Sequence, residues 1–142
     1  MGYGKPYTEL YCHLVWATYD RLPLIHVEDE ARLYEAIRAK AAELRCDVLA
    51  VCGTMDHLHV VCHLHPTVSV SVLVQQIKGA SSHLMTHAVL GPESFRWQGS
   101  YGAFTLQKNA VQVVCRYVLD QKRHHASDTL WPLWEMSRVS ED

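Results

Sequence analysis

Two histidines separated by one residue carry the clearest chemical signal in this sequence. His57 and His59 stand at the start of an apolar, β-branched run, 57–64, and a similar run precedes it at 46–52. Two such runs joined by a short turn predict adjacent strands. Because side chains alternate along a strand, both imidazoles should point from one face and Leu58 from the other. Two imidazoles at this spacing can bind one divalent metal ion.

Chance pairing is one alternative, because the chain has ten histidines and His63 and His65 repeat the spacing. A mixed zinc site is another, because Cys52 and Cys62 are close in sequence to the pair. Strand alternation turns Cys62 away from both histidines, which argues against it as a ligand. The five cysteines are an odd number without a C-x-x-C pair, so we expect free thiols that pack as small hydrophobes.

A tyrosine and a glutamine further along the chain could complete a reactive site. Asn109 and Gln112 have the spacing of a capping box and predict a helix at 109–124, although its many valines would also suit a strand. On that helix Tyr117 and Gln121 share one face; a half-buried tyrosine beside a solvated glutamine is the plainer interpretation. Two imidazoles and a carboxamide oxygen would form a neutral three-ligand metal site. Its open positions could take a phosphate oxygen, with Tyr117 placed as a nucleophile.

The elements that must position these groups follow from hydrophobic periodicity. We expect a strand at 7–19, a helix at 28–44, strands at 46–52 and 57–64, a helix at 68–88, a loop at 90–99, a strand at 100–107 and the helix at 109–124. The order β-α-β-β-α-β is that of an α+β, ferredoxin-like fold with one antiparallel sheet and two helices on one face. The other face should be free and should present His57 and His59.

Composition predicts one domain over 1–142, with a lead at 1–6 and a tail from about 126 to 142 outside the core. Nearly half of the residues are hydrophobic and a fifth are charged, as in soluble globular proteins. We expect a cytoplasmic protein without membrane contact, because no apolar stretch could span a bilayer and no signal peptide opens the chain. The net charge is −2, yet residues 57–127 hold six Lys or Arg against two acids, so a local positive face is plausible.

Five stretches together resemble one protein family. They are YCHLVW at 11–16, MDHLH at 55–59, KGASS at 78–82, WQGSYGAF at 97–104 and YVLDQ at 117–121. In this order they resemble the single-tyrosine HUH transposases of insertion sequences and their relatives, the REP-associated tyrosine transposases. The resemblance implies that His57, His59 and Gln121 bind Mg²⁺ or Mn²⁺. It also implies that Tyr117, on an added C-terminal helix, is the nucleophile.

That family's reaction implies a metal-dependent enzyme that cleaves and rejoins single-stranded DNA at hairpin ends through a 5′-phosphotyrosine intermediate. It further implies a homodimer, with Tyr117 acting in its own subunit or in the partner's. The basic residues expected to contact DNA phosphates are Lys78, Arg96, Lys108, Arg116, Lys122 and Arg123.

Three other functions fit the same residues. One is a module of the same fold that binds a DNA or RNA hairpin without cutting it. A second is a domesticated nuclease that processes REP elements, and a third is a small hydrolase or oxygenase that uses the histidine pair with a water molecule. The sequence pI of about 6.5 is unusual for a DNA-holding protein.

Overall fold

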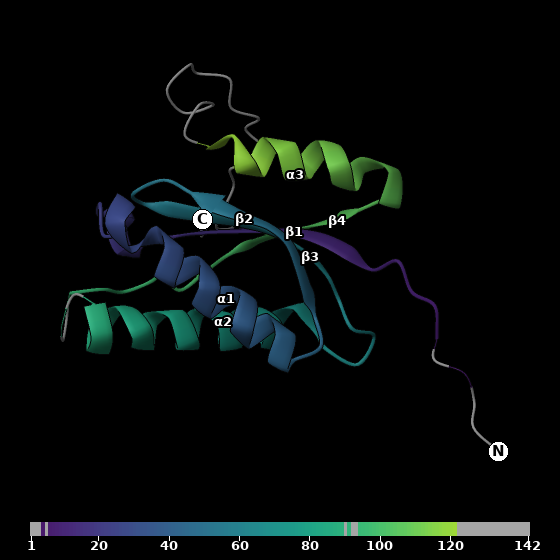
Figure 1. Ribbon diagram of the computed structural model, residues 1–142, viewed down its shortest axis with the longest axis horizontal. Coiled ribbons are helices and arrows are strands. Elements are labelled where there is room, and N and C mark those ends of the chain that lie inside the picture. The colour runs from purple at the N-terminus through teal and green to yellow at the C-terminus, as the bar shows by residue number, and fades with distance from the viewer. Residues whose placement is uncertain (1–3, 5, 90, 92–93, 122–142) are drawn as a thin grey trace, which may run out of the picture.

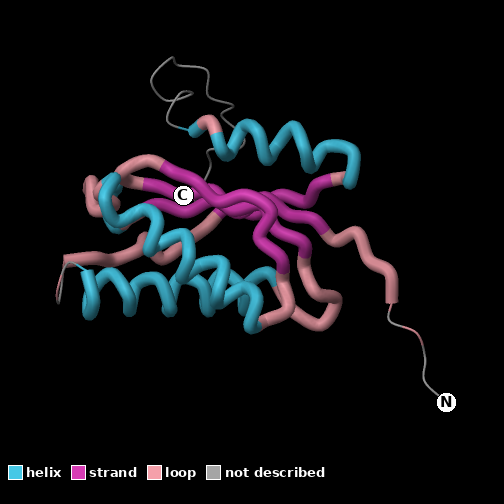
Figure 2. Tube along the Cα trace, in the orientation of Figure 1, coloured by secondary structure: helices cyan, strands magenta, loops and turns pink. Residues whose placement is uncertain are grey.

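The protein forms a three-layer structure around one antiparallel sheet. The computed structural model describes residues 4, 6–89, 91 and 94–121. The elements are β1 (Tyr11–Ala17), α1 (Glu30–Glu43), β2 (Asp47–Gly53), β3 (His57–His63), α2 (Val70–Leu84), β4 (Gly102–Leu106) and α3 (Val111–Leu119). The strand order is β2-β3-β1-β4. Helices α1 and α2 lie on one side of the sheet and α3 on the other (Figures 1 and 2). The predicted α+β sheet with an added third helix is confirmed.

The larger core fills the space between the sheet and helices α1 and α2. It contains the even-numbered side chains of β1 and β3, as the alternation of the sequence predicts. Its fully buried members include Leu14, Trp16, Leu58 and Val60 from the strands, Leu33 and Ile37 from α1, and Leu73 and Ile77 from α2. This packing leaves the odd-numbered side chains of β1 and β3, which include His57 and His59, on the opposite face.

The end of β1 is tied to the turn between β2 and β3. The buried Thr18 donates its backbone N–H to the Asp56 carbonyl (2.9 Å), and its hydroxyl oxygen lies 2.6 Å from the Leu22 carbonyl oxygen. Asp20 and Arg21 both adopt left-handed backbone conformations with φ of 53°, which reverse the chain there. The first strand, predicted at 7–19, is shorter at both ends, and at its C-terminal end this is because the chain leaves the strand at Thr18 to brace the turn.

Helix α2 begins where a side chain can cap it. The Ser69 hydroxyl accepts a hydrogen bond from the Val72 N–H (3.2 Å), satisfying one donor of the first turn. A π-helical turn, Met85–Val89, extends the helix. The predicted helix at 68–88 therefore matches α2 and this turn to within two residues.

Two expectations about α3 are wrong. The capping box does not form, because a 3-10 turn at Lys108–Ala110 precedes α3 and the N-cap position is Ala110, without a side-chain cap. The second face of the sheet is not free either. Val114 and Val118 of α3 pack on it in a smaller core with Ala50 and Val61. The physical reason is that the apolar stripe of α3 needs a surface to bury, and Ala50 of β2 and Val61 of β3 supply one beside the histidines.

All five cysteines are free thiols. Cys12 and Cys62 face each other across β1 and β3 in the larger core, with their Sγ atoms 3.3 Å apart. Cys46 is buried in the same core, so these three pack as predicted, and Cys62 lies on the face away from the histidines. Within the described ranges, no helix has the length and apolar character to cross a membrane.

Gly53 should be essential to the turn that carries His57. A Cβ atom at Gly53 would collide with the His57 backbone and lie 2.9 Å from the Leu58 Cα atom. We therefore predict that Gly53→Ala lowers the free energy of unfolding by roughly 1–3 kcal/mol, as overpacking does. The matched control is Gly79→Ala, because Gly79 lies within α2 and an added Cβ meets nothing within 4 Å.

Gly79→Ala should instead stabilise the protein by about 0.4–1 kcal/mol, because alanine restricts the unfolded chain. Urea unfolding of both variants measures the two free energies. Equal stability of the wild type and Gly53→Ala would contradict the close approach described here.

Candidate active site

The two histidines project from an inner strand into the layer between the sheet and α3. Strand β3 is hydrogen-bonded on both sides, to β2 and to β1, which gives it a rigid frame. His57 and His59 are both fully buried, and their ring centroids lie 5.2 Å apart. The expectation that they share one face is met, but they are covered by α3 rather than exposed to solvent. Their burial follows directly from the packing of α3 on this face.

Tyr117 and Gln121 come to the same place from the other end of the chain. Tyr117 is buried on α3, and its ring centroid lies 6.0 Å from that of His59 at an angle of 79°. Gln121, just beyond α3, is also buried, with its Oε1 atom 3.2 Å from His57 Nε2. The structure therefore brings together all four side chains that the sequence singled out for chemistry, and all four belong to one chain.

The Nδ1 atom of His57 contacts polar side chains of the turn between β2 and β3. His57 Nδ1 lies 2.8 Å from Asp56 Oδ1 and 2.9 Å from Thr54 Oγ1, while the Thr54 hydroxyl donates to Asp56 Oδ1 (3.2 Å). The pKa of Asp56 is lowered, chiefly by the hydrogen bond from His57. The charges of His57 and Arg21 and the Thr54 hydroxyl also lower it, whereas burial of the carboxyl group raises it. A carboxylate and a hydroxyl whose proton is already donated can only accept from His57. Nδ1 of His57 therefore carries a proton.

This proton assignment makes the contact between His57 and Gln121 informative. When the ring is neutral and protonated at Nδ1, His57 Nε2 has a lone pair, and it faces another acceptor, Gln121 Oε1. A proton or a cation between them would relieve the repulsion. Ligand atoms in adjacent positions of an octahedral ion with bonds of about 2.1 Å lie about 3.0 Å apart, close to the observed 3.2 Å. The donor set thus fits a divalent metal ion.

Within the described part of the chain, no three His, Cys, Asp or Glu side chains are grouped so as to hold a metal ion. The fit therefore depends on the carboxamide of Gln121 as the third ligand. Of the two cysteines considered for a mixed zinc site, Cys62 lies in the other core, whereas Cys52 pairs with His59 across β2 and β3 and packs on the histidine side of the sheet.

A third imidazole, which the sequence analysis did not assign to the site, lies beside His59. His13 of β1 is fully buried, and its Nε2 atom lies 2.8 Å from His59 Nδ1. The two rings stack with centroids 5.0 Å apart. The alternation of β1 places His13 on the correct face, but only the register between β1 and β3 brings it next to His59.

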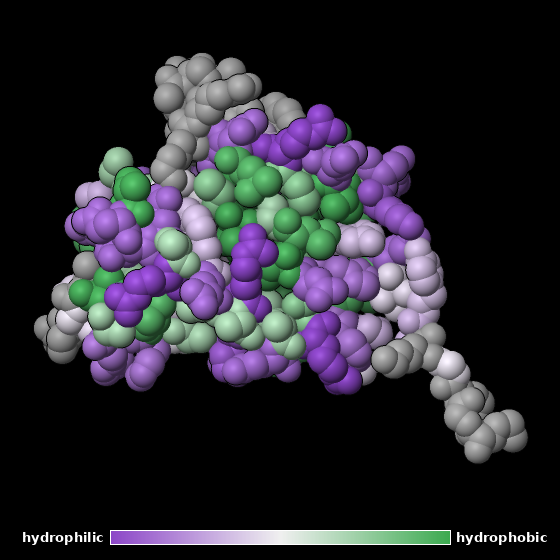
Figure 3. Space-filling view, in the orientation of Figure 1, coloured by the Kyte–Doolittle hydropathy of each residue, from purple (hydrophilic) through white to green (hydrophobic). Residues whose placement is uncertain are grey.

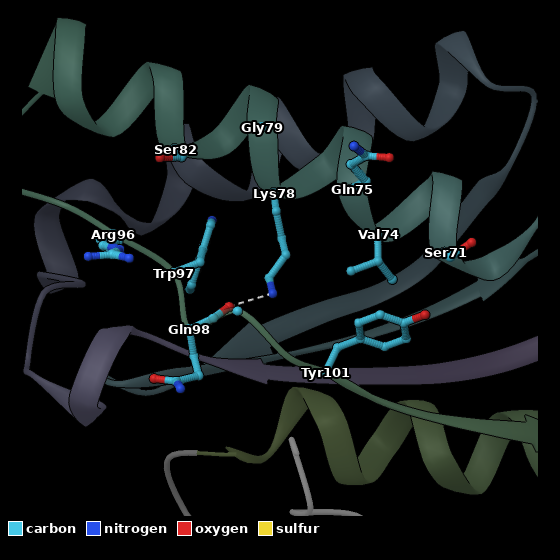
Figure 4. A pocket seen from close by; sticks show the side chains of 11 residues that line it. Ser71, Val74, Gln75, Lys78, Gly79, Ser82, Arg96, Trp97, Gln98 and Tyr101 are labelled. Carbon is cyan, nitrogen blue, oxygen red and sulfur yellow. Dashed lines mark hydrogen bonds between the residues drawn. The ribbon is translucent and has the colours of Figure 1, made fainter. Parts of the chain in front are cut away.

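The basic residues expected to contact DNA are not on one surface. Lys78 and Arg96 line a pocket of ≈ 410 Å³ beside α2, on the side of the sheet away from the histidines (Figure 4). Lys78 Nζ donates to the carbonyls of Gln98 (2.6 Å) and Ser100 (2.9 Å), and burial lowers the pKa of Lys78 to about 8.

The remaining candidates lie elsewhere or outside the description. Arg116 is exposed on α3, and Lys108 is exposed in the turn before it, near Glu9. The guanidinium of Arg96 lies 4.5 Å from the centre of the Tyr19 ring, a cation–π contact. Lys122 and Arg123, and the predicted tail at about 126–142, fall outside the described residues.

Comparisons with known proteins agree with this architecture. A candidate transposase from Deinococcus radiodurans matches with a TM-score of 0.61 and 23% identity, over 85% of this chain and 98% of that one. A REP-associated tyrosine transposase solved with a REP hairpin matches with a TM-score of 0.65 and 13% identity, over 100% and 95% of the two chains. At these identities the likeness concerns the fold.

A comparison with curated proteins found no match. The family model described as "Transposase IS200 like" matches residues 6–121, which include β1, both histidines, Tyr117 and Gln121. These residues span the whole sheet and all three helices. The chain therefore belongs to the IS200-like transposase family.

Proposed function

We propose that this transposase cleaves and rejoins single-stranded DNA at hairpin ends, with Tyr117 as the nucleophile and a 5′-phosphotyrosine intermediate. The observation that carries the proposal is the convergence of Tyr117 and Gln121 on His57 and His59 within one chain. Hairpin binding alone would need none of these four groups. The REP hairpin in a protein of similar fold supports the choice of a DNA hairpin as substrate.

The metal site in this proposal consists of His57 Nε2, an imidazole nitrogen of His59 and Gln121 Oε1. Mg²⁺ or Mn²⁺ bound there would supply Lewis-acid polarisation of the scissile phosphate. Imidazole ligands favour Mn²⁺ over Mg²⁺, so the choice in the cell depends on availability. Asp56 and Thr54 orient the His57 ring by holding its Nδ1–H.

The bond exchange conserves the phosphodiester. Tyr117 Oη forms a bond to phosphorus, the bond from phosphorus to the 3′ oxygen breaks, and the tyrosine proton ends on the released 3′-hydroxyl. A different 3′-hydroxyl can reverse the step and rejoin the strands. Because one ester replaces another, no nucleotide triphosphate is consumed.

Access to Tyr117 requires a movement of α3. Tyr117 is 2% exposed, because the helix that carries it, α3, lies on the sheet (Figure 1). The smaller core that holds α3 has few buried members, and the 3-10 turn at Lys108–Ala110 connects it to β4. We infer that α3 lifts from the sheet about this turn when DNA enters.

A homodimer is part of the proposal. Strands β2 and β4 are the edges of the sheet, and an edge strand offers unpaired backbone groups to a second chain. Leu49 of β2 is 41% exposed, and apolar side chains gather on the visible face between α1 and α3 (Figure 3). Pairing through the β2 edge would cover this apolar surface.

Tyr117→Phe tests the nucleophile. We predict that the substitution removes covalent DNA adducts, by at least about a thousand-fold as expected for loss of a nucleophile, while hairpin binding stays near the wild-type level. Denaturing gels with a hairpin-ended single strand measure the adduct. A 3′ label should migrate with the wild-type protein, whereas a 5′ label should be released with a free 3′-hydroxyl.

Tyr11→Phe is the matched control, because Tyr11 lies on the same face of the sheet but stacks on His63, away from the site. It should form adducts at the wild-type rate. Full adduct formation by Tyr117→Phe would refute the assignment, and hairpin binding without any adduct in the wild type would favour the non-cleaving module.

Metal binding gives an independent test. Calorimetric titration of Mn²⁺ into the wild type should reveal one site per chain that His57→Ala abolishes, because His57 supplies one of three ligands. His83→Ala is the control. His83 and His87 form an exposed pair on α2 and the turn after it, with ring centroids 4.3 Å apart, so this variant tests for Mn²⁺ binding by another pair of neighbouring histidines. Equal Mn²⁺ binding by the wild type and His57→Ala would disprove the site.

The pKa of Lys78 predicts how DNA affinity depends on pH. With a pKa of about 8, the Lys78 side chain is charged at pH 7 and mostly neutral at pH 9. If it contacts a phosphate, DNA affinity should fall severalfold across this range, and Lys78→Met should remove that fall. In Lys78→Met the slope of log affinity against log salt concentration should also become shallower by roughly 0.7, which is the contribution of one phosphate contact on single-stranded DNA.

Lys108→Met is the matched control, because the hydrogen bond with Tyr7 and the charge of Glu9 raise the pKa of Lys108 and keep it charged throughout. Its removal should leave the pH dependence in place. Fluorescence anisotropy with a labelled hairpin measures both variants. An identical pH profile in Lys78→Met and the wild type would place the phosphate contact elsewhere.

A further inference from the structure

His13 has an environment that is unusual for a structural core residue. It lies on the central strand β1, fully excluded from solvent, between the rings of His59 and Phe104. An apolar side chain would fill this space without the cost of removing a polar ring from water. The presence of an imidazole here therefore calls for a chemical reason, and its 2.8 Å contact with His59 supplies one.

The sheet register determines which atoms meet. His13 pairs directly with Val61, and His59 pairs with Val15, so the two histidines are diagonal neighbours on one face of adjacent strands. Diagonal neighbours lie within reach of aromatic side chains. The contact joins His13 Nε2 to His59 Nδ1, which leaves Nε2 of His59 as the nitrogen that can coordinate an ion.

Hydrogen-bond chemistry then constrains the tautomer of each ring. A neutral imidazole has one N–H donor and one lone pair. If His13 donated to His59 Nδ1, the His59 proton would be on Nε2 and would block coordination by that nitrogen. If His59 Nδ1 donates to His13, the lone pair of His59 is on Nε2. The His57 ring has the same arrangement, with Nδ1–H donated to Asp56.

We propose that His13 is a positioning residue for His59. Its Nε2 lone pair accepts the Nδ1–H of His59 and so fixes the tautomer and the ring orientation in which His59 Nε2 can bind the metal ion. The inference rests on the proposed metal site and extends it. Asp56, in the turn, and His13, on β1, would then have the same function. Each accepts the Nδ1–H of one proposed ligand histidine, Asp56 from His57 and His13 from His59.

The tautomer of His59 can be measured without metal or DNA. Nitrogen chemical shifts of the ¹⁵N-histidine-labelled full chain, assigned with a His59→Gln variant, distinguish Nδ1–H from Nε2–H. We expect His59 to be protonated at Nδ1 in the wild type. A His59 ring protonated at Nε2 alone would overturn the inference, whatever the stability of any variant.

Metal affinity provides the second measurement. His13→Phe keeps an aromatic ring but removes the acceptor, and we expect it to weaken Mn²⁺ binding by about 10- to 100-fold, as is typical when a partner of a ligand histidine is lost. His13→Gln should restore much of the affinity, because its side-chain oxygen can accept the same hydrogen bond. Rescue by glutamine would not be expected if His13 only filled space.

His63→Phe is the matched control. His63 lies on the same face of the same strand as His59, but its Nε2 atom contacts the Thr8 carbonyl (2.8 Å) instead of a site residue. It should bind Mn²⁺ as the wild type does. Wild-type affinity in a folded His13→Phe protein would overturn the role of His13.

The two levels of the proposal fail separately. Tyr117-dependent adducts together with an Nε2–H tautomer of His59 would refute the role of His13 and leave the transposase chemistry in place. Absence of adducts together with the expected tautomer and affinity changes would refute the strand-transfer function and leave His13 as the partner of a metal ligand.

Discussion

The packing of α3 against the second face of the sheet is the contact on which the candidate site depends. Val114 and Val118 bury against Ala50 and Val61, and this apolar contact places Tyr117 over the histidines. The hydrophobic effect therefore assembles a polar cluster that would gain little from its own interactions. This second core is much smaller than the one under α1 and α2, so less apolar surface holds α3 on the sheet than holds α1 and α2.

The buried polar side chains of the site have polar partners, which offset the cost of removing them from water. His57 is held by Asp56 and Thr54 from the turn, and His59 by His13 from the neighbouring strand. Each ring therefore contacts a polar partner, which lies in the turn for His57 and on β1 for His59. The turn itself is fixed by Gly53, whose missing side chain allows the close backbone approach, and by the hydrogen bonds from Thr18.

The distribution of charge separates the site from the basic groups that line the pocket beside α2. Lys78 and Arg96 lie beside α2, on the far side of the sheet from Tyr117, whereas Arg116 is on α3 itself. A DNA substrate that touched both regions would have to wrap around an edge of the sheet. Local positive groups of this kind are compatible with a net charge of −2.

Local sequence patterns determined the order of strands and helices, the shared face of His57 and His59, and the side of β3 that packs under α1 and α2. They could do so because the alternation of side chains along a strand and their repeat along a helix depend only on positions close in sequence. They could not place α3 on the sheet, and the predicted cap at Asn109 is wrong because Asn109 lies within a 3-10 turn that precedes the helix. Nor could they pair His13 with His59 or His57 with Gln121, which are 46 and 64 residues apart. Alternation defines a face but not a register, so only the folded sheet decided which imidazoles lie in contact.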